Sequence, residues 1–226
     1  MKKIVLFACL IIFGSAAFAN IELDTCFYGT VFGQKTLDSD YAEKYLDTKF
    51  KQGIGFGKED SISLFFGHHA GIFDVGLGFL ENFDFYSNSH ASSNDYKGTG
   101  INLGFGMGPV FRLTFTDHFS LFIRPSFILN VHTFAFAERK EMDLMDSLRM
   151  TDFSIGSNLN IGGRTWILNT SGYHLGLAYG ADFSFTGGSG HFSTKGISTM
   201  DYKLYSLATK IYLGLCMNFG DRGIDR

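Results

Sequence analysis

Apolar and polar residues alternate with a period of two along the C-terminal stretch of the chain. From 205 to 219 the odd positions are apolar apart from Thr209, and the even positions are mixed in character. A period of two places every second side chain on the same face of an extended strand. The stretch exceeds both the average strand of about five or six residues and the roughly 9–11 residues that span a bilayer. It therefore predicts a membrane-barrel strand with a lipid-facing row of Tyr205, Leu207, Thr209, Ile211, Leu213, Leu215, Met217 and Phe219.

The same alternation recurs upstream and gives eight strands in all. We expect them at about 21–32, 50–66, 72–86, 99–115, 119–138, 150–166, 173–186 and 203–219. The second is interrupted by Lys58-Glu59-Asp60, which leaves a ten-stranded alternative in which these residues form a turn. The pattern predicts an all-β fold, a transmembrane antiparallel up-and-down β-barrel of eight strands, or of ten in the alternative.

The connections between these strands alternate in length. Short segments fall at 67–71, 116–118 and 168–172, and long polar segments fall at 33–48, 87–98, 139–149 and 187–202. Short periplasmic turns and long outer loops are typical of outer-membrane barrels. This arrangement places both termini in the periplasm and makes 87–98 and 187–202 exposed outer loops.

The N-terminus has the pattern of an export signal. Lys2 and Lys3 precede an apolar run at 4–13, and Ala17-Phe18-Ala19 has the small residues of a cleavage site. We therefore expect a cleaved signal peptide at 1–19, a barrel at 20–219 and a short periplasmic tail at 220–226. Because the chain has no other apolar run of about 18 residues, no transmembrane helix is expected. Export without a helical anchor predicts the outer membrane of a two-membrane bacterium.

Composition agrees with a strand-rich membrane protein. The chain has 26 Phe, 10 Tyr and 28 Gly but only 2 Pro, which favours strands with few breakers. Removal of Lys2 and Lys3 changes the net charge from −3 to −5, so a basic surface for nucleic acid is absent and no nucleic-acid partner is expected.

Residues with reactive side chains do not form a recognisable catalytic or metal site in the sequence. His90-Ala91-Ser92 is the nearest local arrangement to a nucleophile and base, but it lies in a polar loop segment. His68 and His69 are adjacent, so on a strand they would point to opposite faces. We therefore expect no enzyme activity, no cofactor and no metal.

The last strand also carries a recognisable terminal motif. Residues 212–219 match polar-x-Gly-x-x-apolar-x-aromatic through Tyr212, Gly214, Met217 and Phe219. This motif resembles the assembly signal of small eight-stranded outer-membrane barrels, the OmpA/OmpX and OmpW-like group. The resemblance implies recognition by the barrel-assembly machinery, contact with outer-membrane lipid and, for the OmpW-like members, a small and even apolar solute. The tail 220–226 departs from the group, which usually ends on the aromatic residue.

Charged residues on the inward parity predict a network in the lumen. Lipid penalises a charged side chain on the outer face by about 2–4 kcal/mol for Arg or Lys at the midplane, whereas charges inside can pair. Arg124 lies near the middle of its strand and is the expected hub. The predicted network consists of Glu22, Asp24, Asp74, Asp84, Arg112, Arg124, His132, Glu138, Asp182 and Lys210.

Inward glycines of neighbouring strands predict a lumen sector without side chains. They are Gly53, Gly55, Gly57, Gly76, Gly78, Gly104, Gly106 and Gly108. Such a sector favours a narrow, porin-like channel or a small-solute uptake barrel. The competing interpretation is a filled lumen, since eight-stranded barrels normally hold side chains rather than water. Large inward residues at Phe122, Ile128 and Phe134 would then occupy the space.

The outer segments support an alternative function, a surface-exposed structural or adhesion protein that contacts a host. Met142, Met145 and Leu148 are at helical spacing, and Tyr41 and Tyr45 are four residues apart. Each of these two segments could form a short amphipathic helix over the barrel mouth. Loop packing without a partner is the competing interpretation.

The two cysteines of the expected mature chain fall on the first and last strands. Cys26 and Cys216 share the inward parity, and closure of a barrel pairs these two strands. The periplasm is oxidising, so a disulfide could join the seam. Two free, buried thiols are the alternative, because a bridge needs Cα atoms about 5.5 Å apart.

Overall fold

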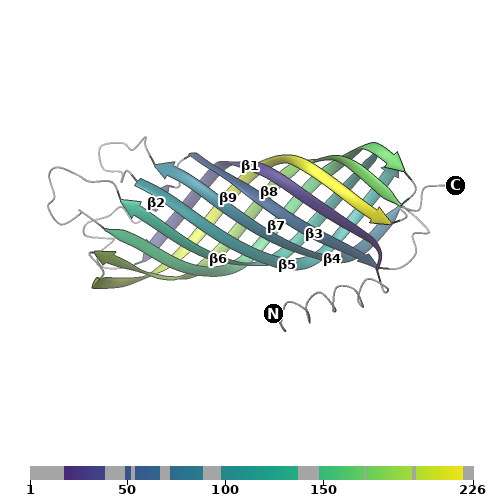
Figure 1. Cartoon of the computed structure of the whole chain (residues 1–226). Helices are drawn as coiled ribbons and strands as arrows, with labels where there is room; N and C mark the ends of the chain where they lie inside the picture. Colours follow the sequence, from purple (N-terminus) through teal and green to yellow (C-terminus); the bar gives the residue numbers. More distant parts are fainter. Residues whose placement is uncertain are drawn as a thin grey trace, which may run out of the picture.

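The chain folds into a closed antiparallel β-barrel (Figure 1). The computed structural model describes residues 18–38, 49–51, 54–66, 72–88, 98–136, 148–170, 172–194 and 197–220. The strands are β1 (Phe18–Asp38), β2 (Lys49–Lys51), β3 (Ile54–Phe66), β4 (Phe73–Asn88), β5 (Gly98–Thr116), β6 (Phe119–Phe136), β7 (Arg149–Thr170), β8 (Tyr173–Thr194) and β9 (Ile197–Gly220). Both β2 and β3 pair with the same side of β1, so together they form the second of eight barrel strands.

Each strand pairs with the next along the chain, and β9 returns to β1 to close the ring. The seam runs from the pair Asn20 and Gly220 to the pair Asp38 and Lys203. The eight-stranded up-and-down fold is therefore confirmed. The ten-stranded alternative is wrong, because β3 continues without a turn through Lys58-Glu59-Asp60.

The two faces of the wall differ in chemistry. Outward residues are apolar and exposed, for example Phe105, Phe127 and Leu213 at 53%, 53% and 59%. Inward residues are buried and include most of the charged side chains that the structure describes. An apolar exterior with a polar interior inverts the arrangement of a water-soluble barrel and suits a wall surrounded by lipid.

Among the residues that the structure describes, no helix is long and apolar enough to cross a membrane.

The strands β7, β8 and β9 are 22, 22 and 24 residues long, about twice the length that a bilayer requires. The predicted loop 187–202 is therefore wrong: most of it forms a hairpin in which Gly187 pairs with Tyr205 and Thr194 pairs with Ile197. The strands continue because Phe192 and Tyr202 point inward and are buried. Serine and glycine between them suggested a loop from the sequence.

The two prolines of the chain lie opposite each other in the barrel wall. The β5–β6 pairing stops at Met107 and Phe127 and resumes in the same register at Phe111 and Ile123. That register sets Pro109 across from Pro125. Because proline has no N–H to donate to a ladder, placing both prolines in one rung confines the lost hydrogen bonds to a single site.

Several sequence predictions fall outside the described residues. They concern residues 1–17 of the expected signal peptide at 1–19, residues 221–226 of the expected tail at 220–226, and the residues Tyr41, Tyr45, Gly53, His68, His69, His90, Ser92, Glu138, Met142 and Met145. Leu148 is described, and its side chain is buried against the inside of the barrel mouth.

Candidate functional site

The interior of the barrel is the candidate site, and its end nearest the short turns is occupied by two arginines. Arg112 of β5 contacts Glu22 and donates to Asp74 at 2.8 Å through Nε. Arg164 of β7 forms a two-pronged contact with Asp24, at 3.1 and 2.6 Å, and its Nη1 lies 2.8 Å from Glu22. We call these five residues the arginine cluster. Two cations between three carboxylates neutralise most of the charge buried there.

Aromatic rings support both guanidinium groups. The Arg112 guanidinium carbon lies 4.2 Å from the centre of the Phe65 ring, and that of Arg164 lies 4.0 Å from the centre of the Phe122 ring. A cation over an aromatic face is stabilised by the quadrupole of the ring, more so where water is excluded. All four side chains are fully buried, so the cluster closes this end of the lumen.

A second group of charges occupies the middle of the barrel. Lys210 of β9 lies 2.9 Å from Asp84 of β4, and its Nζ stands 4.3 Å from the centre of the Tyr28 ring. The Tyr28 hydroxyl donates to the same carboxylate, and the Asn102 amide donates to it at 2.9 Å. Asp84 therefore accepts hydrogen bonds from three strands besides its own.

Arg124 does not act as the centre of the network. It forms one ion pair, with Glu59 at 2.7 Å, and its Nε and Nη1 make no hydrogen bond among the described residues. Asp182 instead accepts from the amides of Asn158 and Asn160, at 2.8 and 3.4 Å. The largest connected groups form around Glu22 and Asp152 rather than around Arg124.

The third group centres on Asp152, nearer the end with the long connections. Its carboxylate accepts from Lys35 at 3.0 Å, from His132 Nδ1 at 2.6 Å and from Tyr202 at 3.2 Å. His132 also contacts the Tyr86 hydroxyl through Nε2. Both imidazole nitrogens are therefore engaged, and no serine or cysteine lies among these partners to act as a nucleophile.

An apolar layer lies next to this third group and fills the barrel toward the long connections. Tyr86 stacks on His132 at 5.4 Å and on Phe134 at 5.7 Å between ring centres. We call this layer the aromatic cap. It consists of Leu37, Tyr86, Phe134, Phe136, Leu148, Met150, Phe192, Tyr202 and Leu204.

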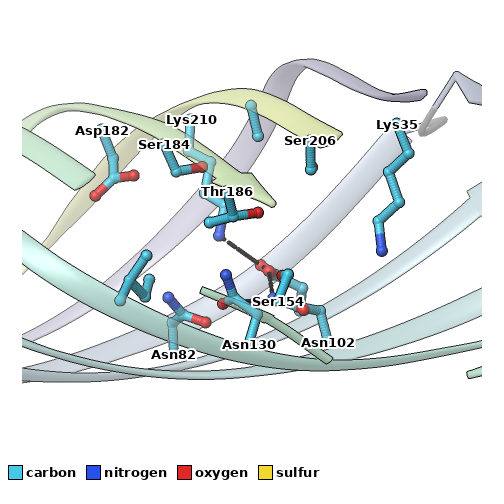
Figure 2. A pocket seen from close by; sticks show the side chains of 13 residues that line it. Lys35, Asn82, Asn102, Asn130, Ser154, Asp182, Ser184, Thr186, Ser206 and Lys210 are labelled. Atoms are coloured by element: carbon cyan, nitrogen blue, oxygen red, sulfur yellow. Dashed lines mark hydrogen bonds and ion pairs between the residues drawn. The ribbon is translucent and has the colours of Figure 1, made fainter. Parts of the chain in front are cut away.

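A small polar cavity lies inside the barrel between the second and third charge groups (Figure 2). Its volume is about 30 Å³. That is enough for a water molecule or two but not for an organic solute. The charged side chains of Lys35, Asp84, Asp182 and Lys210 border it, with serine, threonine and asparagine around them.

The predicted glycine sector is not open. An added Cβ would meet the Tyr28 ring at Gly57, the Arg124 side chain at Gly78 and the Leu80 side chain at Gly106, each at less than 3.0 Å. An added Cβ would also meet the Thr30 side chain at Gly55 and two asparagine side chains at Gly104, whereas at Gly76 and Gly108 it would meet the backbone of the neighbouring strand. Side chains therefore occupy the space beside five of these seven glycines, which agrees with the competing interpretation of a filled lumen.

The seam disulfide is not formed. Cys26 and Cys216 are both buried and free. The register pairs Cys26 with Gly214 and sets Cys216 opposite Asp24, so the two cysteines are diagonal neighbours. Diagonal positions lie about 7–8 Å apart, beyond the usual Cα separation of a disulfide.

The terminal motif lies on β9 with its residues on two faces. The Tyr212 side chain points inward and donates to Asn160 at 2.8 Å, and Gly214 faces the same way against Cys26. Phe219 points outward, with its ring 5.6 Å from that of Tyr173, and Met217 lies on the same face. Recognition of this strand by an assembly machinery stays a prediction.

The structure brings together most of the predicted network but adds members that the sequence analysis missed. Glu22, Asp24, Asp74 and Arg112 share the arginine cluster, while Asp84 and Lys210 pair in the middle. His132, Arg124 and Asp182 lie in separate groups. The missed charges are Lys35, Glu59, Asp152 and Arg164. All but Lys35 continue the inward parity of a predicted strand, which was the available signal.

Comparisons with known proteins give similarity of shape only. No protein-family model and no curated protein sequence matches the chain. The outer membrane protein OprG from Pseudomonas aeruginosa shares 10% of residues at a TM-score of 0.48, over 91% of this chain and 98% of OprG. The Escherichia coli outer membrane protease OmpT shares 9% of residues at a TM-score of 0.44, over 88% of this chain and 97% of OmpT. Neisserial surface protein A shares 11% of residues at a TM-score of 0.42, over 90% of this chain and 97% of its own. All three share at most 11% of residues with this chain at TM-scores below 0.5, so they carry no information about its activity.

Proposed function

We propose that this chain is a closed outer-membrane barrel with a structural and surface-contact role, rather than an open pore. The observation that carries the proposal is the filled lumen. The arginine cluster closes one end, the aromatic cap fills the other, and the cavity between them has a volume of about 30 Å³. Eight-stranded barrels that hold side chains in this way have no aqueous path.

The wall beyond the lipid supports the contact role. Val131 lies twelve residues above Phe119 on β6, which at about 3.3 Å per residue and the tilt of such barrels is roughly 30 Å from the turn. A hollow of about 400 Å³ lies at this level on the outside of β6–β9, with Phe153, His191 and Asp201 in its lining. A wall that presents apolar, imidazole and carboxylate groups together suits contact with another molecule. Assembly through the β9 motif and contact with outer-membrane lipid belong to the same proposal.

Planar-bilayer recording of the refolded full chain tests the closed lumen. We expect no discrete openings from protein that shows heat-modifiable migration on a gel, the sign of a folded barrel. A matched variant, Phe134→Ala with Phe192→Ala, removes two rings of the aromatic cap but leaves the arginine cluster in place, so it should also show no discrete openings. Reproducible openings of the unaltered protein would contradict the proposal.

The second candidate is a gated path for a small polar solute. It is favoured by the polar cavity, because Lys35, Asp84, Asp182 and Lys210 bring charges of both signs to one space in the middle of the barrel. The polar lining argues against the apolar solute that the resemblance implies. Liposome swelling with small sugars and amino acids tests this candidate. Swelling equal to that of protein-free vesicles would exclude those solutes.

A further inference from the structure

Three charged side chains point outward within the apolar face of the barrel. They are Lys58 and Asp60 on β3 and Glu81 on β4, and all three are partly or fully exposed. The neighbouring outward residues along the same strands are apolar and exposed, namely Phe56, Ile62, Phe79 and Phe83. We call the three charged residues the β3–β4 patch.

The patch is the exception on the lipid-facing surface. In the described strands the other outward charges, Asp38, Arg149, Asp201 and Lys203, lie near the ends with the long connections. Asp60 lies six residues from Phe66 at the opposite end of β3, which corresponds to a depth of roughly 15 Å in a band about 25 Å tall. A charge at this depth on the lipid side is destabilising unless something there compensates it.

Within one chain the patch is only partly compensated. Lys58 forms an ion pair with Asp60 at 2.7 Å. Glu81 sits directly opposite Asp60 in the β3–β4 register, and among the described residues it has no ion-pair partner. Like charges directly opposite each other across two strands repel. The patch therefore has one cation and two anions, and the carboxylate of Glu81 is the anion without an ion-pair partner among the described residues.

We propose that the β3–β4 patch is the contact surface of a homodimer within the membrane. Two copies in one membrane share the same orientation, so a two-fold axis along the membrane normal relates them and brings the same patch together from both sides. Lys58 lies eight residues from Phe66, and Glu81 lies eight residues from Phe73 at the same end of the barrel. The two side chains therefore lie at the same depth, and Lys58 of each copy faces Glu81 of the other.

The chemistry of the patch fits a second copy better than a lipid headgroup. An ammonium group has three donors, so Lys58 can keep Asp60 within its own chain and also reach Glu81 of the other copy. The patch has an excess of negative charge, which repels phosphate. Each copy supplies both the cation that the other lacks and the carboxylate that the cation contacts.

Sedimentation equilibrium of the refolded full chain in density-matched detergent micelles tests the dimer. We expect a monomer–dimer equilibrium for the unaltered protein, and Glu81→Lys should weaken association about tenfold or more because it places Lys against Lys at the contact. The exchanged variant, Lys58→Glu with Glu81→Lys, should restore association. Glu81→Gln serves the same purpose if Glu81→Lys does not fold, with a smaller loss.

Ser157→Glu is the matched control, because Ser157 is exposed on β7, away from the patch. It should leave association unchanged. A monomer at all protein-to-detergent ratios, or equal losses in Ser157→Glu and Glu81→Lys, would overturn the proposal. The inference rests on the membrane placement given under the proposed function, but not on a closed lumen. A protein that stays folded and dispersed without detergent would contradict that placement itself, which separates the two failures.

Discussion

The inner and outer faces of the barrel wall hold charged residues under different conditions. Inside, each described lysine and arginine contacts at least one carboxylate, and these contacts come from strands far apart in the sequence. Outside, Lys58 pairs only with its neighbour on the same strand, and Glu81 has no described partner. The comparison shows that the ring of strands, rather than the choice of residue, determines whether a charge in a membrane is compensated.

The physical reason lies in what surrounds each charge. The interior offers carboxylates, amides and hydroxyls from opposite walls within hydrogen-bond distance, whereas lipid offers no partner. A buried charge that loses its partner keeps its full desolvation cost. The inner groups should therefore be sensitive to single substitutions, and the outer ones much less so.

The largest effect is expected from Arg164→Ala. This substitution leaves Asp24 and Glu22 buried with only part of their compensation, so we expect a loss of about 3–5 kcal/mol in the free energy of unfolding. Urea titration in lipid vesicles, followed by the fluorescence of the single, buried tryptophan Trp166, measures it. A change below about 1 kcal/mol would show that the arginine cluster contributes little.

A smaller loss is expected from Arg124→Ala. This arginine has one ion-pair partner, Glu59, so its removal should cost about 2 kcal/mol by the same titration. Arg124→Ala with Glu59→Gln is the control, because it removes both charges and should recover part of the loss. If Arg124→Ala cost more than Arg164→Ala, the order of the two groups would be reversed and Arg124 would be the hub after all.

Tyr86→Phe tests the link between the aromatic cap and His132. The ring contacts remain and only the hydroxyl contact to the imidazole is lost, so the expected cost is about 1 kcal/mol. Tyr86→Leu removes the stacking as well and should cost more. Equal values for the two variants would mean that the hydroxyl, rather than the ring, stabilises the cap.

The smallest effect is expected outside. Lys58→Met removes an exposed ion pair and places an apolar side chain toward lipid, so the free energy of unfolding of the monomer should change by less than about 1 kcal/mol. The measurement is the same urea titration, made at a protein concentration so low that the protein is monomeric. A loss as large as that of Arg164→Ala would remove the distinction between the two faces.

The alternation of side chains was enough to predict the barrel, since period two is a local property of a strand. It placed Glu22, Arg112 and Lys210 inside because lipid excludes them from the other face. It did not predict which charges meet, since Arg164 and Asp24 are 140 residues apart in the chain and come together only through closure.

Local irregularities explain the remaining misses. The β1–β9 register shifts between Thr30 and Phe32, so the parity of β1 changes and Lys35 turns inward beyond the predicted strand end. Glu59 was missed because it lies within Lys58-Glu59-Asp60, three consecutive charged residues that resembled a turn. The small residues of the β8–β9 hairpin resembled a loop, although Phe192 and Tyr202 anchor it from inside the barrel.

The rung that contains Pro109 and Pro125 lies between β5 and β6, which are the fourth and fifth of the eight barrel strands. Backbone amides beside this rung have fewer ladder partners than those elsewhere in the wall. Their protons should exchange with deuterium sooner than those at the β1–β9 seam, where pairing runs nearly without interruption. The two prolines thus interrupt the ladder between two consecutive strands of the chain, away from the seam where its first and last strands meet.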